Sequence, residues 1–327
     1  MLATDESLNL LSENCKQLFS DGTFRYAPKD FSQLYSFHIF REGYYVPVAY
    51  FLVRRKNEDT YVSILEMLKD ECNKLGLSLN VQYFSLDFEQ SAINAIRHMF
   101  GPDIPIRTCR FHLCQSWMKK IGELGLKTVY RSRKSEAGQW MRKCFGLPGI
   151  CIDSVTEFFN DHFVKTAPLS KCPKLQKFIN YLNRNYMRPN SLYPPKLWAG
   201  ICTTDLKTST NSVESWHQKF GEFFNSRKGN PNIYEFLERL NDNHMYAMMK
   251  GEDCQETKDA DAKREYLRNL HDRLLKKEIT IDAFLFSVRR KKIPKAKPTT
   301  RKSQRVKKKR IVGNPAKRQC LDSYWSL

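Results

Sequence analysis

The sequence predicts an α/β protein with a mixed five-stranded sheet flanked by helices. Three strand-like runs follow one another near the beginning of the chain, and two shorter runs then alternate with segments of helical periodicity. With 41% hydrophobic and 13% aromatic residues, the 327-residue chain can bury a large core, and its length allows one or two domains. We therefore expect a globular protein rather than a disordered one.

The first three strands are predicted to be antiparallel. Residues 15–20 form a short strand that ends at Asp21-Gly22. Residues 32–40 and 44–53 are β-rich runs, and the Arg-Glu-Gly sequence at residues 41–43 between them is a hairpin signal. The run over residues 44–53 is the longest apolar stretch, and it is too short to cross a bilayer.

Helices and strands alternate in the next part of the chain. A helix is predicted over residues 60–75, because Val62, Leu65 and Leu68 share one face and Gly76 can end it. The elements that follow are a strand over 81–86, a helix over 88–100, a strand over 104–109 and a helix that contains Trp117 and Ile121. In a sheet of order 3-2-1-4-5, the first and fourth strands are neighbours.

The remaining sequence divides into three parts. Strand signals fade over residues 122–208, which we interpret as a helical insertion ended by a proline-rich stretch at 189–195. Residues 209–288 are predicted to be helices that close the domain begun by residues 1–121, with one helix that starts at Asn211 and others over 233–249 and 259–290. Residues 289–327 form a basic tail that we expect to be disordered.

Three carboxylates stand in settings suited to chemistry. Asp21 ends the first strand, Asp87 lies just past the fourth strand, and Glu214 lies on a helix with Val213 and Trp216 in its apolar stripe. If that helix packs on the sheet, the three side chains converge. Hard oxygen ligands of this kind suit Mg²⁺ or Mn²⁺, and two such ions can activate a water or a 3′ hydroxyl in a phosphate displacement.

Each carboxylate also has an ordinary structural interpretation. Asp21-Gly22 is a common turn dipeptide. Asp87 can cap the helix that follows it, and Asn211 with Glu214 three residues later forms a variant of the capping box. The residues alone therefore leave these alternatives open.

Four motifs taken together resemble the catalytic domain of Mutator-like element (MULE) transposases. They are Asp21-Gly22-Thr23-Phe24, Ser85-Leu86-Asp87-Phe88-Glu89, Cys109-Arg110-Phe111-His112, and the sequence Asn-Ser-Val-Glu-Ser-Trp-His at residues 211–217. The resemblance covers residues 18–224 and implies a ribonuclease H-like catalytic domain, formed by residues 1–121 and 209–288, with a helical insertion before the glutamate. It implies Asp21, Asp87 and Glu214 as a triad that binds two Mg²⁺ or Mn²⁺ ions, with Cys109 and His112 beside it.

The histidines near these motifs have more than one possible role. Cys109 and His112, with Cys114 nearby, suggest zinc, but a structural zinc site normally needs four ligands and no second close-spaced pair occurs. We favour His112 near the active site, where it can contact phosphate, and Cys109 packed in the sheet. His217 lies three residues after Glu214, so it can orient that carboxylate or bond to the backbone.

The net charge of +20 is concentrated near the end of the chain. Fifteen Lys and Arg residues lie between Arg289 and Arg318, and no acidic residue separates them. The clusters are typical of nuclear import signals or of sequence-independent phosphate contact, although a solvated tail without a partner is the alternative. Their members are Arg289, Arg290, Lys291, Lys292, Arg301, Lys302, Lys307, Lys308, Lys309 and Arg310.

The first functional hypothesis is a metal-dependent cut-and-paste DNA transposase in the nucleus. Such a transposase would bind the DNA of the element ends and of the target as a homo-oligomer. We expect no membrane partner. The second hypothesis is a domesticated, inactive nuclear DNA-binding protein, and the third is a ribonuclease H-like nuclease acting on RNA. Transposases of this family usually carry an upstream DNA-binding module, whereas only twenty residues precede Asp21. We expect either a truncated copy or end recognition through the insertion, the tail or another subunit.

Overall fold

The computed structural model describes residues 1–24, 26–42, 44–203, 211–222, 224, 231–249 and 256–289. Within these ranges, the side chains of residues 211, 212, 214, 215, 249 and 256–261 lie outside the described part. No helix in the described ranges combines the length and apolarity that crossing a bilayer requires. The basic clusters beyond Arg289 lie outside the described residues.

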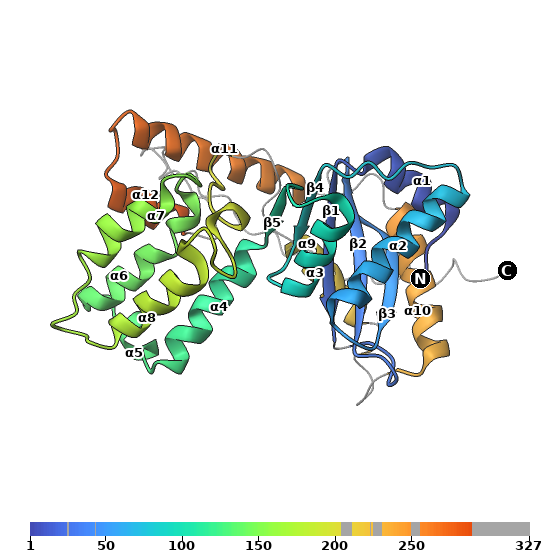
Figure 1. The fold of residues 1–327 in the computed structure, drawn as a ribbon, viewed down its shortest axis with the longest axis horizontal. Coiled ribbons are helices and arrows are strands. Elements are labelled where there is room, and N and C mark those ends of the chain that lie inside the picture. Colours follow the sequence, from blue (N-terminus) through green and yellow to red (C-terminus); the bar gives the residue numbers. More distant parts are fainter. Residues whose placement is uncertain are drawn as a thin grey trace, which may run out of the picture. The chain divides into compact units, whose positions relative to one another are not determined.

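A single five-stranded sheet organises the first part of the chain (Figure 1). Its order is β3-β2-β1-β4-β5, with β1–β2 and β2–β3 antiparallel and β4 parallel to both of its neighbours. The strands are β1 (Gln17–Thr23), β2 (Gln33–Arg41), β3 (Tyr44–Val53), β4 (Tyr83–Leu86) and β5 (Ile106–Thr108). The predicted mixed α/β sheet and its strand order are confirmed, and this order is that of a ribonuclease H-like fold.

Alternation along β2 divides the core into two layers. Tyr35, Phe37 and Ile39 belong to the cluster that includes residues of α1 (Asp5–Asn14) and α2 (Glu58–Lys74). Leu34, on the opposite face, packs in a second cluster with Phe220 and other side chains of α9 (Asn211–Glu222) and α10 (Ile233–Met249). Helices from before and after the insertion therefore cover opposite faces of one sheet (Figure 1).

Several helix ends differ from the sequence prediction for local reasons. Helix α2 begins at Glu58, two residues earlier than predicted, because Asn57 takes the extended conformation of an N-cap. Helix α3 (Gln90–Phe100) begins after Glu89 rather than directly after the fourth strand. Helix α1, which the periodicity analysis did not predict, begins with a capping box between Thr4 and Ser7.

The predicted helical insertion is helical where it is described. It packs around Trp117 of α4 (Arg110–Glu123), whose ring makes edge contacts with Phe145, Tyr186 and Trp198. The other elements are α5 (Lys127–Arg131), α6 (Glu136–Cys144), η1 (Leu147–Gly149), α7 (Val155–Phe158), η2 (Phe159–Val164), α8 (Leu175–Leu182), η3 (Asn183–Met187) and η4 (Pro195–Leu197). The domain boundaries themselves stay predictions.

The end of the insertion is fastened to the sheet by two side chains of β5. Arg107 donates to the carbonyl oxygens of Lys196 and Ala199, at 3.1 and 2.7 Å. Thr108 donates to the carbonyl of Leu197 at 3.1 Å. Because Arg107 is buried, its guanidinium would be costly without these acceptors. These hydrogen bonds hold residues 196–199 next to β5, shortly before α9 begins.

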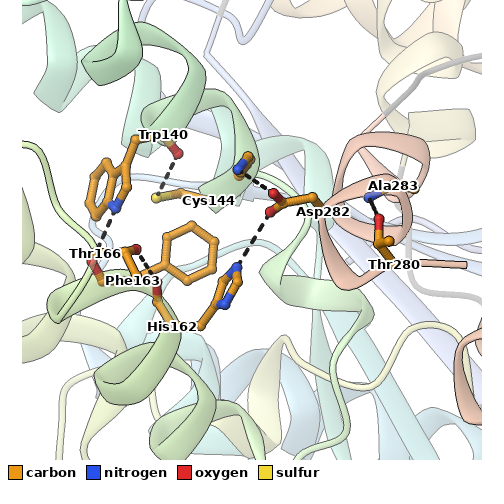
Figure 2. Close-up of polar contacts among 9 residues, drawn as sticks. Trp140, Cys144, His162, Phe163, Thr166, Thr280, Asp282 and Ala283 are labelled. Carbon is orange, nitrogen blue, oxygen red and sulfur yellow. Dashed lines mark hydrogen bonds and ion pairs between the residues drawn. The ribbon is translucent and has the colours of Figure 1, made fainter. Parts of the chain in front are cut away.

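Two helices replace the single helix predicted over residues 259–290. They are α11 (Glu256–Leu275) and α12 (Ile281–Val288), and they are separated by Lys277, which has a positive φ of 59°. Thr280 then caps α12 by accepting from the backbone N–H of Ala283. Figure 2 shows this cap beside Asp282, which pairs with His162 of the insertion.

Helix α12 is held on the insertion by charge and by close backbone approach. The carboxylate of Asp282 lies 2.7 Å from the ammonium of Lys143 and 3.4 Å from the His162 ring. Partial burial raises the pKa of Asp282, but its interactions with Lys143 and His162 together lower the pKa below its usual value. At Gly146, a Cβ atom would lie 2.6 Å from the Cα of Leu285 in α12. A side chain at this position would therefore push α12 away.

We predict that Gly146→Ala destabilises the protein by about 1–3 kcal/mol, because the methyl group overlaps the backbone of α12. Gly122→Ala is the matched control, since a Cβ at Gly122 within α4 meets nothing within 4 Å. That variant should be stabilised by up to about 1 kcal/mol through helix propensity. Urea unfolding of both variants measures the difference, and equal stability changes would refute the close packing at Gly146.

Candidate active site

Asp21 lies within β1, and its carboxylate is held by two donors. Its side chain is buried, and Oδ1 accepts from the backbone N–H of Gly22 at 2.9 Å. Oδ2 lies 3.2 Å from Nδ1 of His217 on α9. Because each carboxylate oxygen has two lone pairs, both oxygens keep capacity for a further ligand.

Asp87 follows β4 at the position next to Asp21. The parallel register pairs Phe19 of β1 with Ser85 of β4, and Asp21 and Asp87 each lie two residues further along. Two residues along a strand restores the same face, and neighbouring strands are about 4.8 Å apart. The sheet therefore places both aspartates on one face of adjacent strand ends, as the sequence predicts.

The electrostatics of Asp87 reflect this crowding. Burial, followed by the nearby charges of Asp21 and Glu89, raises the pKa of its carboxyl to a net value of about 6. His112 and Lys56 oppose the shift without cancelling it. The carboxylates at this strand end are therefore only partly compensated by positive charge from the chain.

His112 provides one of these positive charges. It lies in the first turn of α4, and burial lowers its pKa, but the Cys109 thiol and the carboxylates of Asp21 and Asp87 together raise the pKa to about 9. The imidazole is therefore protonated at neutral pH when no metal is bound. His112 of the Cys-x-x-His pair thus interacts electrostatically with both aspartates, and the role of the pair stays a prediction.

Lys56 and Glu89 are site residues that the sequence analysis did not assign. The Lys56 ammonium lies 3.0 Å from the Glu89 carboxylate and 4.6 Å from the centre of the Phe24 ring. Glu89 belongs to the motif that contains Asp87, so its position in the sequence is a usable signal. Lys56 lies in a loop before α2, and no local pattern identifies it.

His217 connects the distant helix α9 to Asp21. The two side chains are 5% and 7% exposed, so their contact is shielded from water. Glu214 lies on the same helix three residues earlier, and positions i and i+3 of a helix share a face. The described backbone thus brings the helix that carries Glu214 to β1. The side chain of Glu214 lies outside the described residues, and its role stays a prediction.

Two ordinary interpretations do not match the local structure. Asp21-Gly22 forms no turn, because both residues pair with β2 inside the strand, Asp21 with Ser36 and Gly22 with Tyr35. Asp87 does not cap α3, since the N-cap of that helix is Glu89. The conformations of Asp21 and Asp87 are thus not explained by local capping or turn formation.

The donor set around Asp21 and Asp87 fits a magnesium-type cation. Among described residues, no group of three or more His, Cys, Asp or Glu side chains is close enough to form a metal site, which also gives no support to zinc at Cys109 and His112. Mg²⁺, however, is commonly bound by one or two carboxylates together with water and substrate phosphate. The raised pKa of Asp87 is the physical indication that additional positive charge is favourable here.

Comparison with protein families identifies the class of this domain. Residues 17–116 match the family model of the MULE transposase domain. This match spans β1 through the first part of α4, including Asp21, Asp87 and the Cys109–His112 pair. No curated protein matches the chain. Residues 17–116 are therefore similar to the MULE transposase domain, in agreement with the resemblance of the sequence motifs.

We predict that Asp87→Asn stabilises the metal-free protein in a pH-dependent way. A folded-state pKa of about 6 lies above the reference value of 3.8, so native stability contributed by the protonated carboxyl is lost as pH rises through 6. Relative to the native chain, the variant should gain about 2–3 kcal/mol at pH 8 and little at pH 4.

Urea unfolding in EDTA at the two pH values measures this difference. Asp70→Asn on the exposed face of α2 is the control and should change stability by less than about 0.5 kcal/mol at both. An equal effect of Asp87→Asn at pH 4 and pH 8 would contradict the crowded-carboxylate site.

Proposed function

We propose that this protein is a DDE-type DNA transposase in which Asp21, Asp87 and Glu214 bind two Mg²⁺ or Mn²⁺ ions. The observation that carries the proposal is the in-register placement of Asp21 and Asp87 at adjacent strand ends, with α9 bonded to Asp21. The match to the MULE transposase domain supports DNA as the substrate.

The chain's own residues prepare the site for phosphate chemistry. Gly22 and His217 fix the two oxygens of the Asp21 carboxylate, which reduces its freedom before substrate binds. The Lys56 ammonium and the protonated His112 ring place positive charge near the carboxylates, where a substrate phosphate would enter. Bound divalent ions would supply activation of a water or a 3′ hydroxyl and stabilisation of the leaving oxygen.

The insertion supports the loop that carries Asp87. Tyr193 donates a hydrogen bond of 2.8 Å to the carbonyl of Phe88, and the two rings make an edge contact with centroids 4.9 Å apart. Because Phe88 directly follows Asp87, these contacts limit the movement of the Asp87 carboxylate. We propose that the insertion in this way belongs to the same catalytic unit.

The Lys and Arg clusters of the basic tail are the feature that favours nuclear import and contact with DNA phosphates. Its charge would bind DNA without sequence preference and with strong salt dependence. We propose a nuclear location and assembly of a homo-oligomer on DNA, because two element ends must be joined to one target.

We predict that Asp87→Asn reduces strand transfer by about a hundredfold or more, since it removes a charged metal ligand. The assay uses the full chain, Mg²⁺ or Mn²⁺, a pool of 3′-hydroxyl duplexes with randomised ends and a supercoiled plasmid target. Joined products are amplified and counted by sequencing. The matched control, Asp70→Asn, should retain native activity.

The outcomes separate the three functional hypotheses. Equal activity of the native chain and Asp87→Asn would refute metal-dependent catalysis at this site. DNA binding without any joined product from the native chain would select the domesticated, inactive DNA-binding protein. Cleavage of RNA alone, abolished by Asp87→Asn, would select the RNA nuclease.

A further inference from the structure

Asp21 is the first member of a buried chain of hydrogen bonds. His217 Nδ1 lies 3.2 Å from Asp21 Oδ2, and His217 Nε2 lies 2.9 Å from Ser36 Oγ. Ser36 Oγ also lies 2.9 Å from His38 Nε2. All four residues are buried. Such a network inside the core is costly unless its members satisfy one another.

The sheet explains how these residues meet. Ser36 and His38 are two residues apart on β2, so their side chains share a face. Ser36 is the antiparallel partner of Asp21 on β1, which places these two side chains next to each other. His217 enters from α9 and bonds to both of them.

The Asp21 carboxylate determines where the protons lie along this network of hydrogen bonds. An ionised Asp21 can only accept, so Nδ1 of His217 must carry a proton. When the His217 ring carries only this proton, its Nε2 is an acceptor and the Ser36 hydroxyl donates to it. Ser36 in turn accepts from Nε2–H of His38. His38 stays neutral because burial, reinforced by the neighbouring His217, lowers its pKa well below 6.5.

The surroundings of His38, at the other end of the hydrogen-bond network, agree with this placement of the protons. With its proton on Nε2, His38 has an unprotonated Nδ1, and this atom is buried without a hydrogen-bond partner among the described residues. The reverse direction would leave an N–H at that position unpaired. The bonds therefore run from His38 through Ser36 and His217 to Asp21.

We propose that His217 is a positioning residue, oriented by Ser36 and His38, that fixes the Asp21 carboxylate for a divalent cation. The inference rests on the proposed function in taking Asp21 as a metal ligand. Gly22 N–H holds Oδ1 and His217 holds Oδ2, so rotation of the carboxylate is opposed at both oxygens. Residues that orient a metal ligand in this way typically change metal affinity 10–100-fold when replaced.

Two substitutions at one position separate this role from simple helix attachment. In His217→Asn, the amide nitrogen can take the place of Nδ1 and keep the bond to Asp21. In His217→Gln, the amide can take the place of Nε2 and keep the bond to Ser36 instead. Attachment of α9 by either bond predicts similar behaviour, whereas positioning of Asp21 predicts that only His217→Asn is tolerated.

We predict that Mn²⁺ binds His217→Asn within about threefold of its native affinity and binds His217→Gln at least about tenfold more weakly. Isothermal titration of the full chain with Mn²⁺ measures the affinities, and circular dichroism verifies folding. Ser36→Ala, which frees the His217 ring without touching Asp21, should give an intermediate loss. Imidazole ¹⁵N shifts of the native protein should show protonated Nδ1 at His217.

Equal Mn²⁺ affinity in the two His217 variants, or a His217 ring protonated on Nε2 alone, would overturn the inference. If His217→Gln does not fold, unchanged Mn²⁺ affinity in Ser36→Ala overturns it instead. A native chain that binds Mn²⁺ with the predicted variant pattern but joins no DNA would refute the transposase proposal and leave the positioning role standing. A native chain that binds no Mn²⁺ would refute both.

Discussion

The site depends on the cost of holding two aspartates side by side at a buried strand end. Parallel pairing of β1 and β4 brings Asp21 and Asp87 to the same face, and burial makes their mutual repulsion stronger than in water. Burial is the largest cause of the raised pKa of Asp87, and the charges of Asp21 and Glu89 add to it. His112 and Lys56 oppose the shift, yet the pKa remains at about 6. A charged pocket of this kind is unfavourable for stability and favourable for binding a cation.

Much of the remaining structure brings distant segments to that strand end. Arg107 and Thr108 of β5 fasten the end of the insertion, and the chain then continues towards α9. Helix α9 buries Phe220 against the sheet and bonds to Asp21 through His217. Residues separated by almost two hundred positions therefore meet because two apolar surfaces pack together, and the polar contacts follow from that packing.

The fold could be predicted from the sequence where periodicity and turn chemistry are strong. The bounds of β3 and α10 match their predicted ranges. The alternation of strands and helices predicts the fold class, and the confirmed strand order is the one expected for a ribonuclease H-like fold. The break between α11 and α12 was missed because helical spacing continues across it, and the turn uses Lys277 rather than glycine at its positive φ. Short α1 was missed because a ten-residue amphipathic segment gives a weak signal.

Only those parts of the site that depend on strand order could be predicted from the sequence. Asp21 and Asp87 follow from strand order, whereas the partner of His217 depends on how α9 docks on β1 and β2. The spacing of His217 from Glu214 predicted that carboxylate or the backbone as its partner, and the structure adds Asp21. Ser36 and His38 carry no motif, and only their spacing of two on a strand could have indicated a shared face. The places of Asp21 and Asp87 are set by strand register, but that of His217 needs tertiary packing.

The most direct test of the central claim is a crystal structure of the protein soaked with Mn²⁺ and measured at the manganese absorption edge. The account predicts an anomalous density peak between the carboxylates of Asp21 and Asp87, within about 2.3 Å of an oxygen of each. A peak at other residues with none between these two carboxylates, at a Mn²⁺ concentration that saturates binding, would contradict it.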